Sequence, residues 1–424
     1  MLTDAQKLEA LANLGVELNR VADLDLLMER ILTEARRFVN AEAGSIYIRN
    51  NEELDFTYNQ NEVLQKRLPV GGKLIYSTFT IPIDKNSIAG CVAHTGQPLN
   101  IPDVYEIPQA SSFHFGREFD EASGYRSKSM LTIPLTTARK SVVGVLQIIN
   151  AKDDQGNIVT FPESDERIME HFAATATVAL ERAQMTRNMI LRTIRMAEMR
   201  DPKETGAHVN RVGAYSVELY EAWAKKKGIA EDEIDAQRDI LRMAAMLHDV
   251  GKVGISDAIL KKPGRFTPEE FEIMKEHTLF GARLFDDRQS AFDDAAAEVA
   301  LNHHEKWDGT GYPGYVDTAT GRPVEGYIID GQARGKRGEE IPMLGRIVAI
   351  TDVFDALCSK RVYKPAWSEA DSLAVLEEQS GRHFDPELIE LFFNNLDIMR
   401  TVRKRYPDLK ETGQEIPRRT TTNI

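Results

Sequence analysis

Apolar and polar positions follow both helical and strand periods over the first part of the chain. Apolar residues in ADLDLLMERILTEARRFV recur at three- and four-residue spacing, which predicts an amphipathic helix. GSIYIRN alternates like a half-buried strand, and SVVGVLQIINA is a nearly continuous β-branched run typical of a central strand. Turn-rich stretches such as HTGQPLNIPD separate them. We expect an α/β or α+β domain over residues 20–162, preceded by a helix over 1–19.

The pattern becomes purely helical from Pro162 to about Arg200. Proline favours a first helical turn, and the acidic residues that follow it suit the helix dipole. Steps of three and four residues then form a seam with heptad period. The seam is either a parallel two-helix contact in a homodimer, which we favour, or an amphipathic face packed on its own domain. Its members are Met169, Phe172, Ala176, Ala179, Ala183, Thr186, Ile190, Thr193 and Ala197.

The rest of the chain reads as helical, with loops rich in glycine and proline. We expect a linker helix over 163–200, an all-α domain over 201–400 and a basic tail over 401–424, which we interpret as a solvated end. The predicted helical segments lie near 204–227, 232–250, 268–285, 292–303, 343–358 and 367–379.

Composition narrows the classes of function. The formal net charge of −13 disfavours non-specific binding to nucleic acid or to an anionic membrane. No apolar run approaches the length of a membrane span, and the N-terminus lacks a signal-peptide pattern, so we expect a cytoplasmic protein. The two cysteines, Cys91 and Cys358, form no CxxC spacing, so any metal must use histidines and carboxylates.

The histidines are unevenly spread, and five of the nine fall between positions 208 and 304. Glu204 and His208 are four residues apart, so one helical face can present both to a common ion. Alone, such a pair is more often a surface hydrogen bond. His248 and Asp249 end an apolar helix, where a lone pair would usually be a cap but a buried one needs a strong partner such as a metal.

Two further features of the sequence add candidate metal ligands. His303 and His304 are adjacent and point in different directions from a helix, which favours two or three clustered ions. Asp352 lies within an apolar helix, with Asp355 one turn later, and is costly to bury unless it is paired or coordinating. The candidate metal ligands are Glu204, His208, His248, Asp249, His277, His303, His304 and Asp352.

This all nitrogen and oxygen set suits iron, manganese or zinc, with iron or manganese favoured. Ions about 3.5–4 Å apart can hold a bridging hydroxide for attack on phosphorus. The sequence therefore predicts metal-dependent phosphodiester hydrolysis.

The same residues closely resemble the HD-GYP family, a branch of the HD phosphohydrolases. The resemblance rests on ETGAHVNRV (204–212), LHDVGKVGI (247–255), the histidine in MKEHTLFGA, HHEKWDGTGYP (303–313), RIVAITDVFDAL (346–357), RVYKPAW (361–367) and HFDP (383–386). It implies an all-helical phosphodiesterase that hydrolyses cyclic di-GMP to pGpG or GMP. Members with a glutamate at the position of Glu204 can hold three metals.

The resemblance also implies roles for further residues. His248, Asp249 and Lys252 are the implied catalytic residues. Lys252, Tyr312, Arg361 and Lys364 are implied phosphate and guanine contacts, and Arg211 and Asp308 are implied supports that orient ligands.

One departure weakens the substrate assignment. Residues 314–340 stand where the family usually has a shorter connection, and their glycines and charges predict a mobile loop. This loop could supply replacement phosphate contacts from Arg334, Lys336 or Arg337. Mixed cyclic GMP-AMP therefore stays an alternative substrate, and a catalytically silent cyclic-dinucleotide-binding protein stays an alternative function.

The N-terminal domain resembles a GAF domain over about residues 20–183, through IAGCVAHTGQPLNIPDVY, SMLTIPL and SVVGVLQIINAKD. Some GAF domains that bind cyclic nucleotides carry Asn-Lys and later Phe-x-x-x-Asp-Glu. Phe161, Asp165 and Glu166 fit this ending, while Asn150 and Lys152 are separated by an inserted residue. The ligand stays open between a cyclic nucleotide, another molecule and none. We expect this sensor to regulate the phosphodiesterase through the linker helix of a homodimer.

Overall fold

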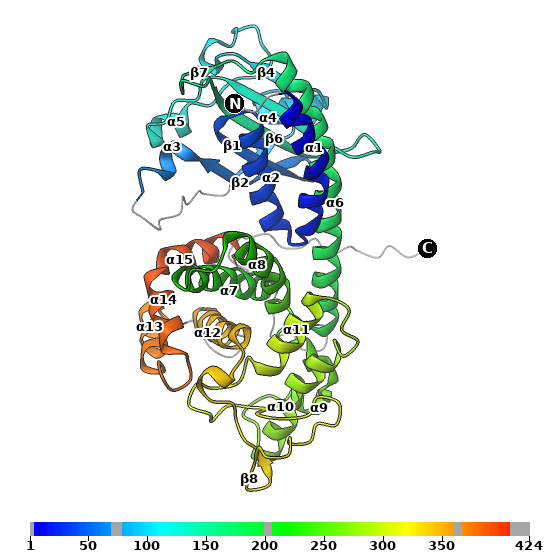
Figure 1. Ribbon diagram of the computed structural model, residues 1–424, viewed down its shortest axis with the longest axis vertical. Coiled ribbons are helices and arrows are strands. Elements are labelled where there is room, and N and C mark those ends of the chain that lie inside the picture. The colour runs from blue at the N-terminus through cyan, green and yellow to red at the C-terminus, as the bar shows by residue number, and fades with distance from the viewer. Residues whose placement is uncertain (1–3, 69–78, 199–205, 360–366, 408–424) are drawn as a thin grey trace. The chain divides into compact units, whose positions relative to one another are not determined.

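The computed structural model describes residues 4–68, 79–198, 206–359 and 367–407 (Figure 1). The chain divides into two compact units, Met1–Arg187 and Asn188–Ile424. Among the described residues, no helix combines the length and the apolar character that crossing a membrane requires.

Unit 1 is built on an antiparallel sheet with the strand order β3-β2-β1-β6-β5-β4, and β7 pairs with β6. The strands β1 and β6 lie at its centre because they carry buried residues on both faces. The strands are β1 (Ala41–Asn50), β2 (Glu53–Asn61), β3 (Thr80–Pro82), β4 (Leu99–Ile101), β5 (Met130–Thr136), β6 (Val142–Lys152) and β7 (Ile158–Val159). The helices are α1 (Asp4–Arg20), α2 (Leu24–Phe38), α3 (Glu62–Gln65), α4 (Ile88–Thr95), η1 (Val104–Glu106), α5 (Glu118–Ser123) and α6 (Glu163–Glu198).

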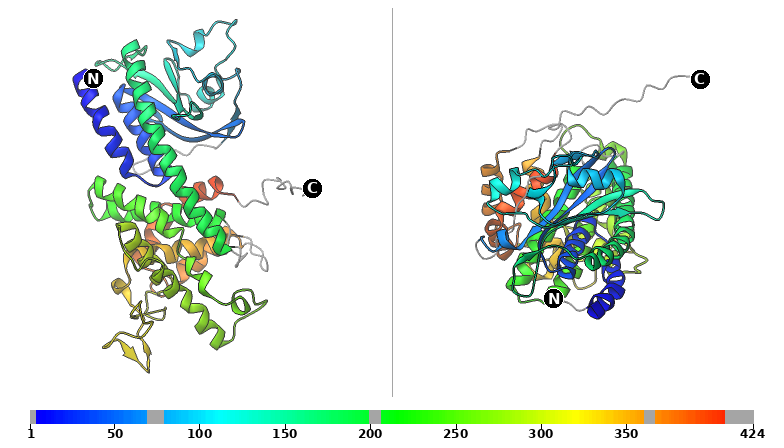
Figure 2. Two further views of the ribbon diagram at one scale, coloured as in Figure 1. Left: turned by 90° about the vertical axis from the view of Figure 1, so that its right-hand side faces the viewer. Right: turned by 90° about the horizontal axis from the view of Figure 1, so that it is seen from above.

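Helices cover both faces of this sheet. In Figures 1 and 2, α1, α2 and the first part of α6 lie side by side against one face. There Ile46 of β1 shares a core with Ile31 of α2 and Phe172 of α6. The next residue, Tyr47, points to the other face because side chains alternate along a strand, and it packs with Val92 of α4. The predicted α/β architecture is confirmed.

The first half of the predicted seam on the long helix α6 packs into the core of unit 1. Its seam residues Met169, Phe172 and Ala183 are fully buried in the core of unit 1. The dimer interpretation of this half of the seam is therefore wrong, because a buried face has no room for a second chain. Beyond residue 187, Ile194 packs with Val209 and with residues of the segment after α8.

In its described residues, unit 2 is helical, as predicted, except for one short hairpin of β8 (Ile328–Ile329) and β9 (Gln332–Ala333). Its helices are α7 (Gly206–Lys226), α8 (Glu231–Ala245), η2 (Val250–Gly254), α9 (Asp257–Leu260), α10 (Pro268–Arg283), α11 (Ala291–Asn302), η3 (Gly338–Glu340), α12 (Met343–Cys358), α13 (Glu369–Glu378), α14 (Pro386–Asn394) and α15 (Leu396–Arg405).

The core of unit 2 is centred on α7, α12 and α14. The ring of Phe354 lies edge-on to Tyr215 and to Phe392, with centroid distances of 5.5 and 4.9 Å. Arg403 donates to the carbonyl of Cys358 at 2.7 Å, so the start of the predicted basic tail is anchored to α12. Residues 408–424 lie outside the described part of the chain.

Glycine allows η2 to approach α10 closely. A Cβ on Gly251 would come within 2.0 Å of the carbonyl oxygen of His277 and 2.2 Å of the amide nitrogen of Gly281. No larger residue fits without moving one of these backbones. This contact brings Asp249, two residues earlier, near the histidine that α10 carries.

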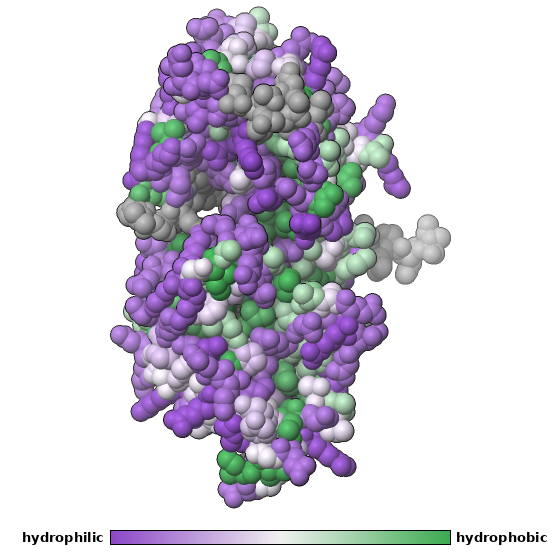
Figure 3. Space-filling model, in the orientation of Figure 1, coloured by the Kyte–Doolittle hydropathy of each residue, from purple (hydrophilic) through white to green (hydrophobic). Residues whose placement is uncertain are grey.

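The insertion over residues 314–340 is folded. Tyr315 and Tyr327 stack with centroids 3.9 Å apart, and the Arg334 guanidinium lies over both rings. Ile328 and Ile329 at the tip are more than half exposed, and Figure 3 shows apolar surface at this end of the unit. The glycines of this segment therefore form turns of an ordered hairpin rather than a chain without structure.

Candidate metal centre

Seven of the eight predicted ligands converge in unit 2. Helices α7, α10 and α12 carry His208, His277 and Asp352, and the turns after α8 and α11 carry the remaining four residues. They form two groups in which each residue offers a ligand atom within 4.8 Å of the others. One group is Asp249, His277, His303 and His304, and the other is His208, His248 and Asp352. Glu204 lies outside the described residues.

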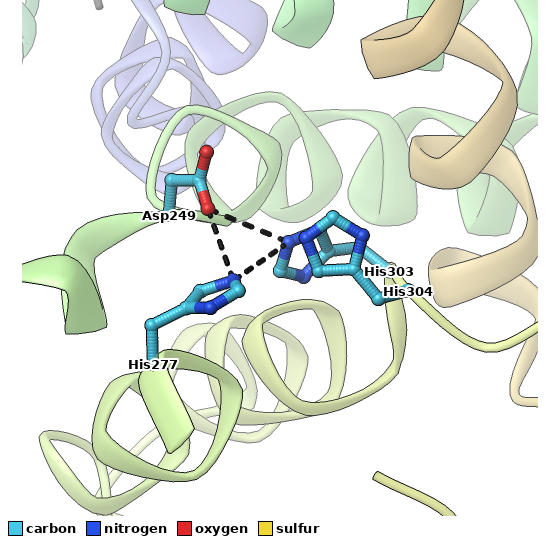
Figure 4. Close-up of side chains that lie close together, drawn as sticks. All are labelled: Asp249, His277, His303 and His304. Carbon is cyan, nitrogen blue, oxygen red and sulfur yellow. Dashed lines mark hydrogen bonds and ion pairs between the residues drawn. The ribbon is translucent and has the colours of Figure 1, made fainter. Parts of the chain in front are cut away.

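The first group surrounds one carboxylate oxygen (Figure 4). Asp249 Oδ1 lies 3.2 Å from His277 Nε2 and 3.6 Å from His303 Nε2. The two imidazole nitrogens are themselves 3.5 Å apart. His304 completes the group, with its ring 4.0 Å from that of His303 and 5.1 Å from that of His277.

The second group meets the first at Asp249. His208 Nε2 and His248 Nε2 lie 3.5 and 3.7 Å from Asp352 Oδ1. His248 Nε2 also lies 3.3 Å from Asp249 Oδ2. The two oxygens of Asp249 therefore face different groups, so this carboxylate would help to hold metal in both.

Hydrogen bonds at the far side of the rings set the tautomers. The Nδ1 atoms of His248 and His277 lie 2.9 and 2.7 Å from the carbonyl oxygens of Ala245 and Met274. His303 Nδ1 lies 3.1 Å from two carbonyl oxygens in α11. A carbonyl oxygen only accepts, so each Nδ1 donates, and in the neutral ring Nε2 then presents its lone pair to the centre.

Burial favours the neutral form of His303 and His304. Burial lowers the pKa of His303, and burial together with His303 and His277 lowers the pKa of His304 well below its usual range. Neutral imidazole nitrogens and carboxylate oxygens thus face one another at short distances. Such a set of electron-pair donors fits divalent cations, because a cation satisfies all of them at once.

Asp249 is held as a carboxylate. Burial disfavours its charged form, but the ammonium group of Lys252 outweighs burial and holds the pKa of Asp249 well below its usual range. Lys252 Nζ donates to Asp249 Oδ2 at 2.5 Å. The ammonium group therefore stands at the edge of the ligand cluster, where the resemblance implies a phosphate contact.

Asp355 is a functional candidate to which the sequence interpretation gave no role. Its buried carboxylate accepts from His208 Nδ1 at 2.8 Å and from Arg211 Nε at 2.6 Å. Burial raises its pKa, but these hydrogen bonds outweigh burial and lower the pKa to about 2. Asp355 fixes the tautomer and ring direction of His208, while Arg211 fixes Asp355. A second carboxylate three residues after Asp352 in an apolar helix was the available signal.

Glu305 is a second residue that the sequence interpretation missed. Its buried carboxylate accepts from the backbone nitrogens of Gly314 at 2.6 Å and Lys336 at 3.2 Å. Lys336 Nζ donates to Asn302 Oδ1. Both ends of the insertion are therefore fastened on either side of His303 and His304.

The implied substrate contacts and supports differ in placement. The Tyr312 ring stacks on His304 with a centroid distance of 4.8 Å, and burial raises its pKa. Asp308 accepts from Thr310 N and Oγ1 at 2.9 and 2.6 Å, so it stabilises its own turn. Arg361 and Lys364 lie outside the described residues.

Two of the three cations of the insertion, Arg334 and Lys336, are engaged in local contacts through their side chains. Arg334 forms two hydrogen bonds to Glu340, at 3.0 and 2.8 Å. Lys336 is fastened to Asn302 as described above. The backbone nitrogen of Arg337 donates to Glu340 at 2.8 Å.

In unit 1, the charged residues of the cyclic-nucleotide pattern pair with other groups. Asp165 forms a buried ion pair with Lys7 at 2.5 Å. Lys152 lies 3.2 Å from Glu62, and Glu166 accepts from Asn100 at 3.1 Å.

Comparisons with known proteins agree with this division. Residues 23–180 match the GAF domain model, and residues 205–357 match the HD domain model. Similarity extends to a Vibrio cholerae cyclic di-GMP phosphodiesterase, with 38% identity over 258 residues, 59% of this chain and 47% of that protein. A Thermotoga maritima cyclic di-GMP phosphodiesterase is 38% identical over half of each chain.

A third relative differs in its stated substrate. The 3'3'-cGAMP-specific phosphodiesterase 2 of Vibrio cholerae is 40% identical over 49% of this chain and 34% of its own length. The chain thus spans half or less of the length of these curated relatives.

Among solved structures, the GAF domain of an Acinetobacter phosphoenolpyruvate-protein phosphotransferase aligns with 44% of this chain and 99% of its own, at 16% identity and a TM-score of 0.32. The assignment of both domains rests on the family models and the motifs. The chain combines a GAF domain with an HD domain, and the three relatives described above are named as phosphodiesterases of cyclic di-GMP or 3'3'-cGAMP.

Proposed function

We propose that this protein is a metal-dependent phosphodiesterase that hydrolyses cyclic di-GMP to pGpG, GMP or both, under the control of its GAF domain. The observation that carries the proposal is the convergence of histidine Nε2 atoms and carboxylates in two groups that meet at Asp249. Structural ion pairs do not need several lone pairs directed at one point, whereas a metal centre does.

The ions would be iron or manganese, since imidazoles and carboxylates share the ligand set. Asp249, His277, His303 and His304 would hold one ion, and His208, His248 and Asp352 the other. Ions bound there would supply an activated water and neutralise charge on the phosphodiester. Glu204 is proposed to add a third ion, which predicts that Glu204→Ala protein loses one equivalent of metal but keeps the others.

The residues of the chain contribute orientation and charge. Hydrogen bonds from the imidazole Nδ1 atoms to the backbone carbonyls and to Asp355 keep the imidazoles in one tautomer, so no reorganisation is required when substrate binds. Lys252 places a positive charge beside the shared carboxylate, where it can contact a phosphate oxygen. Tyr312, stacked on His304, covers one side of the centre.

A second substrate deserves a direct test, because one relative bears the name of a 3'3'-cGAMP-specific phosphodiesterase. Metal analysis of anaerobically purified protein, combined with product chromatography on cyclic di-GMP and mixed cyclic GMP-AMP, separates these possibilities. We expect at least two metal ions per chain and faster cleavage of cyclic di-GMP. Bound metal without cleavage of either compound would favour a silent binding protein.

The proposed regulation runs through α6. Near its end, Ile194 packs with Val209 and Leu247, which directly neighbour His208 and His248. A shift of this helix would therefore displace His208 and His248. Displacements of about 1 Å in an active site can lower the catalytic rate roughly 100-fold. A four-residue insertion after the exposed Asn188 should alter basal activity or ligand response while metal content stays unchanged.

The homodimer is proposed to use a different face of α6 from the buried one. Val178, Met185, Met189 and Met196 are 55–70% exposed, and steps of seven, four and seven residues separate them. On a straight helix they fall within about 40° of one another, so a parallel second copy would meet them with the same residues. Met185→Glu should convert the dimer to a monomer in sedimentation experiments, whereas Asn188→Glu, beside this stripe, should not.

A further inference from the structure

Aromatic rings extend from the metal centre to the surface of unit 2. Tyr312 stacks on the ligand His304, with centroids 4.8 Å apart and planes 28° apart. Phe271, near the start of α10, lies edge-on to Tyr312 with centroids 6.0 Å apart. Phe271 is 42% exposed, so this large apolar ring keeps much of its surface in water. We call Phe271 and Tyr312, together with Lys275, the aromatic shelf.

Lys275 gives the shelf a positive charge. It lies one helical turn after Phe271, on the same face of α10. Its ammonium nitrogen is 5.1 Å from the centroid of Phe271 and 5.4 Å from that of Tyr312, within the range of cation–π attraction. Glu272 pairs with it at 2.7 Å and holds the side chain over these rings. The shelf thus combines aromatic surface with one cation beside a centre that would bind phosphate.

This combination matches one chemical class of ligand. A nucleotide carries a flat aromatic base and an anionic phosphate, and aromatic side chains that bind nucleotides commonly stack on the base. If the metal groups hold a phosphate, the base of the same nucleotide would lie within reach of two rings. These are Tyr312, which stacks on His304, and Phe271, which contacts Tyr312. A purine offers a larger stacking surface than a pyrimidine, so the shelf suits purine nucleotides.

We propose that the aromatic shelf binds one purine base of the cyclic dinucleotide, with Phe271 as a specificity-determining residue. This inference rests on the proposed function, since the metal centre must hold the adjoining phosphate. It assigns to α10 a substrate-binding role in addition to its ligand His277. Phe271 acts through contact with the base and leaves the ions untouched.

The test compares two residues of equal exposure on α10. Phe271→Ala removes the exposed ring of the shelf. Ile273→Ala is the matched control, because Ile273 is also 42% exposed but lies about 200° around the helix from Phe271. Phe271→Trp retains an aromatic surface. Metal content and Tm should be the same in all four proteins.

We expect Phe271→Ala to raise KM for cyclic di-GMP about tenfold with little change in kcat, the range expected for loss of one base-stacking contact. Ile273→Ala and Phe271→Trp should behave like the unmodified protein. Inhibition by inorganic phosphate, which has no base, should be equal in every variant. An unchanged KM in Phe271→Ala would overturn the shelf.

Calorimetric titration with GMP separates this inference from the proposed function, since it requires no turnover. GMP should bind the unmodified metal-loaded chain about tenfold more tightly than the Phe271→Ala variant. Equal affinities would refute the shelf even if hydrolysis were observed. Absence of hydrolysis combined with a difference in GMP affinity would instead refute the phosphodiesterase and leave the shelf as a nucleotide-binding site.

Discussion

The metal centre of the HD domain and the polar interior of the GAF domain both bury hydrogen-bonding side chains, but they satisfy them differently. In the GAF domain, Asn150 Nδ2 donates to Glu42 at 3.1 Å, to the Tyr125 hydroxyl at 2.8 Å and to a backbone carbonyl at 2.9 Å. Asn150 Oδ1 in turn accepts from the nitrogen of Lys128 at 2.7 Å. Here each donor meets an acceptor, so the network is closed without a ligand.

In the HD domain, by contrast, hydrogen-bond acceptors lie close to one another. His277 Nε2, His303 Nε2 and Asp249 Oδ1 lie 3.2–3.6 Å apart, while the donors of both rings point away to backbone carbonyls. Burying such groups is costly unless something positive lies between them. The comparison indicates that a closed network stabilises a fold, whereas converging lone pairs mark a site for a cation.

The largest effect is expected from removing the carboxylate of Asp249, which faces both groups of candidate ligands. Asp249→Ala should abolish hydrolysis and release metal from both groups, because both oxygens face ligand nitrogens. Metal content and product formation measure the two effects. Asp397→Ala, an exposed aspartate on α15, is the control and should leave both unchanged. Full activity in the Asp249 variant would contradict the assignment.

Removing a support should have a smaller effect than removing a ligand. Asp355→Asn should weaken metal affinity about 10- to 100-fold, since the orientation of His208 would no longer be fixed by a carboxylate. Competition with a chelator measures this affinity. If Asp355 served only the fold, the variant would lose stability while its metal affinity stayed at the original value.

Disrupting the hydrogen-bond network of Asn150 should lower the stability of the GAF domain and leave metal binding unchanged. Asn150→Ala removes several buried hydrogen bonds and leaves an alanine at a φ of 59°, a conformation that suits asparagine better. We expect a loss of about 2–3 kcal/mol in the unfolding of the GAF domain. Denaturant unfolding measures the loss, and metal content should not change. A release of metal would show that the two networks are coupled.

Acid should affect the metal-free protein through Asp355. The folded pKa of about 2 lies below the ordinary value of 3.8, so this carboxylate stabilises the fold above pH 3.8, and the contribution disappears as the pH falls through 2. The contribution is about 2 kcal/mol. Unfolding of the metal-free protein between pH 4 and pH 2 should become less steep in Asp355→Asn. Equal pH dependence in both proteins would contradict the ion-pair assignment.

The smallest effect is expected in the insertion. Arg334 is bound to Glu340 at the surface, and exposed pairs of this kind contribute about 0.2–1 kcal/mol. Arg334→Ala should therefore lower stability by less than about 1 kcal/mol and leave KM unchanged. A large rise in KM would instead make this arginine a phosphate contact, as the sequence alone allowed.

The sequence by itself predicted the candidate metal ligands and the class of both domains. Ligand chemistry is carried by residue type, and helical or strand period is local, so ETGAH, LHDVGK and HHEKWDGTGYP were sufficient to predict a metal site on a helical scaffold. The GAF and HD models match the predicted order of domains.

The tertiary structure decided what the pattern left ambiguous. A heptad seam looks the same whether a partner chain or the domain's own core covers it, and only packing showed Phe172 and Ala183 to be buried within unit 1. Likewise, Asp355 and Glu305 gained roles only when folding brought His208 and Lys336 to them from distant positions. Contacts across such separations depend on how helices pack, which the local period of a sequence does not encode.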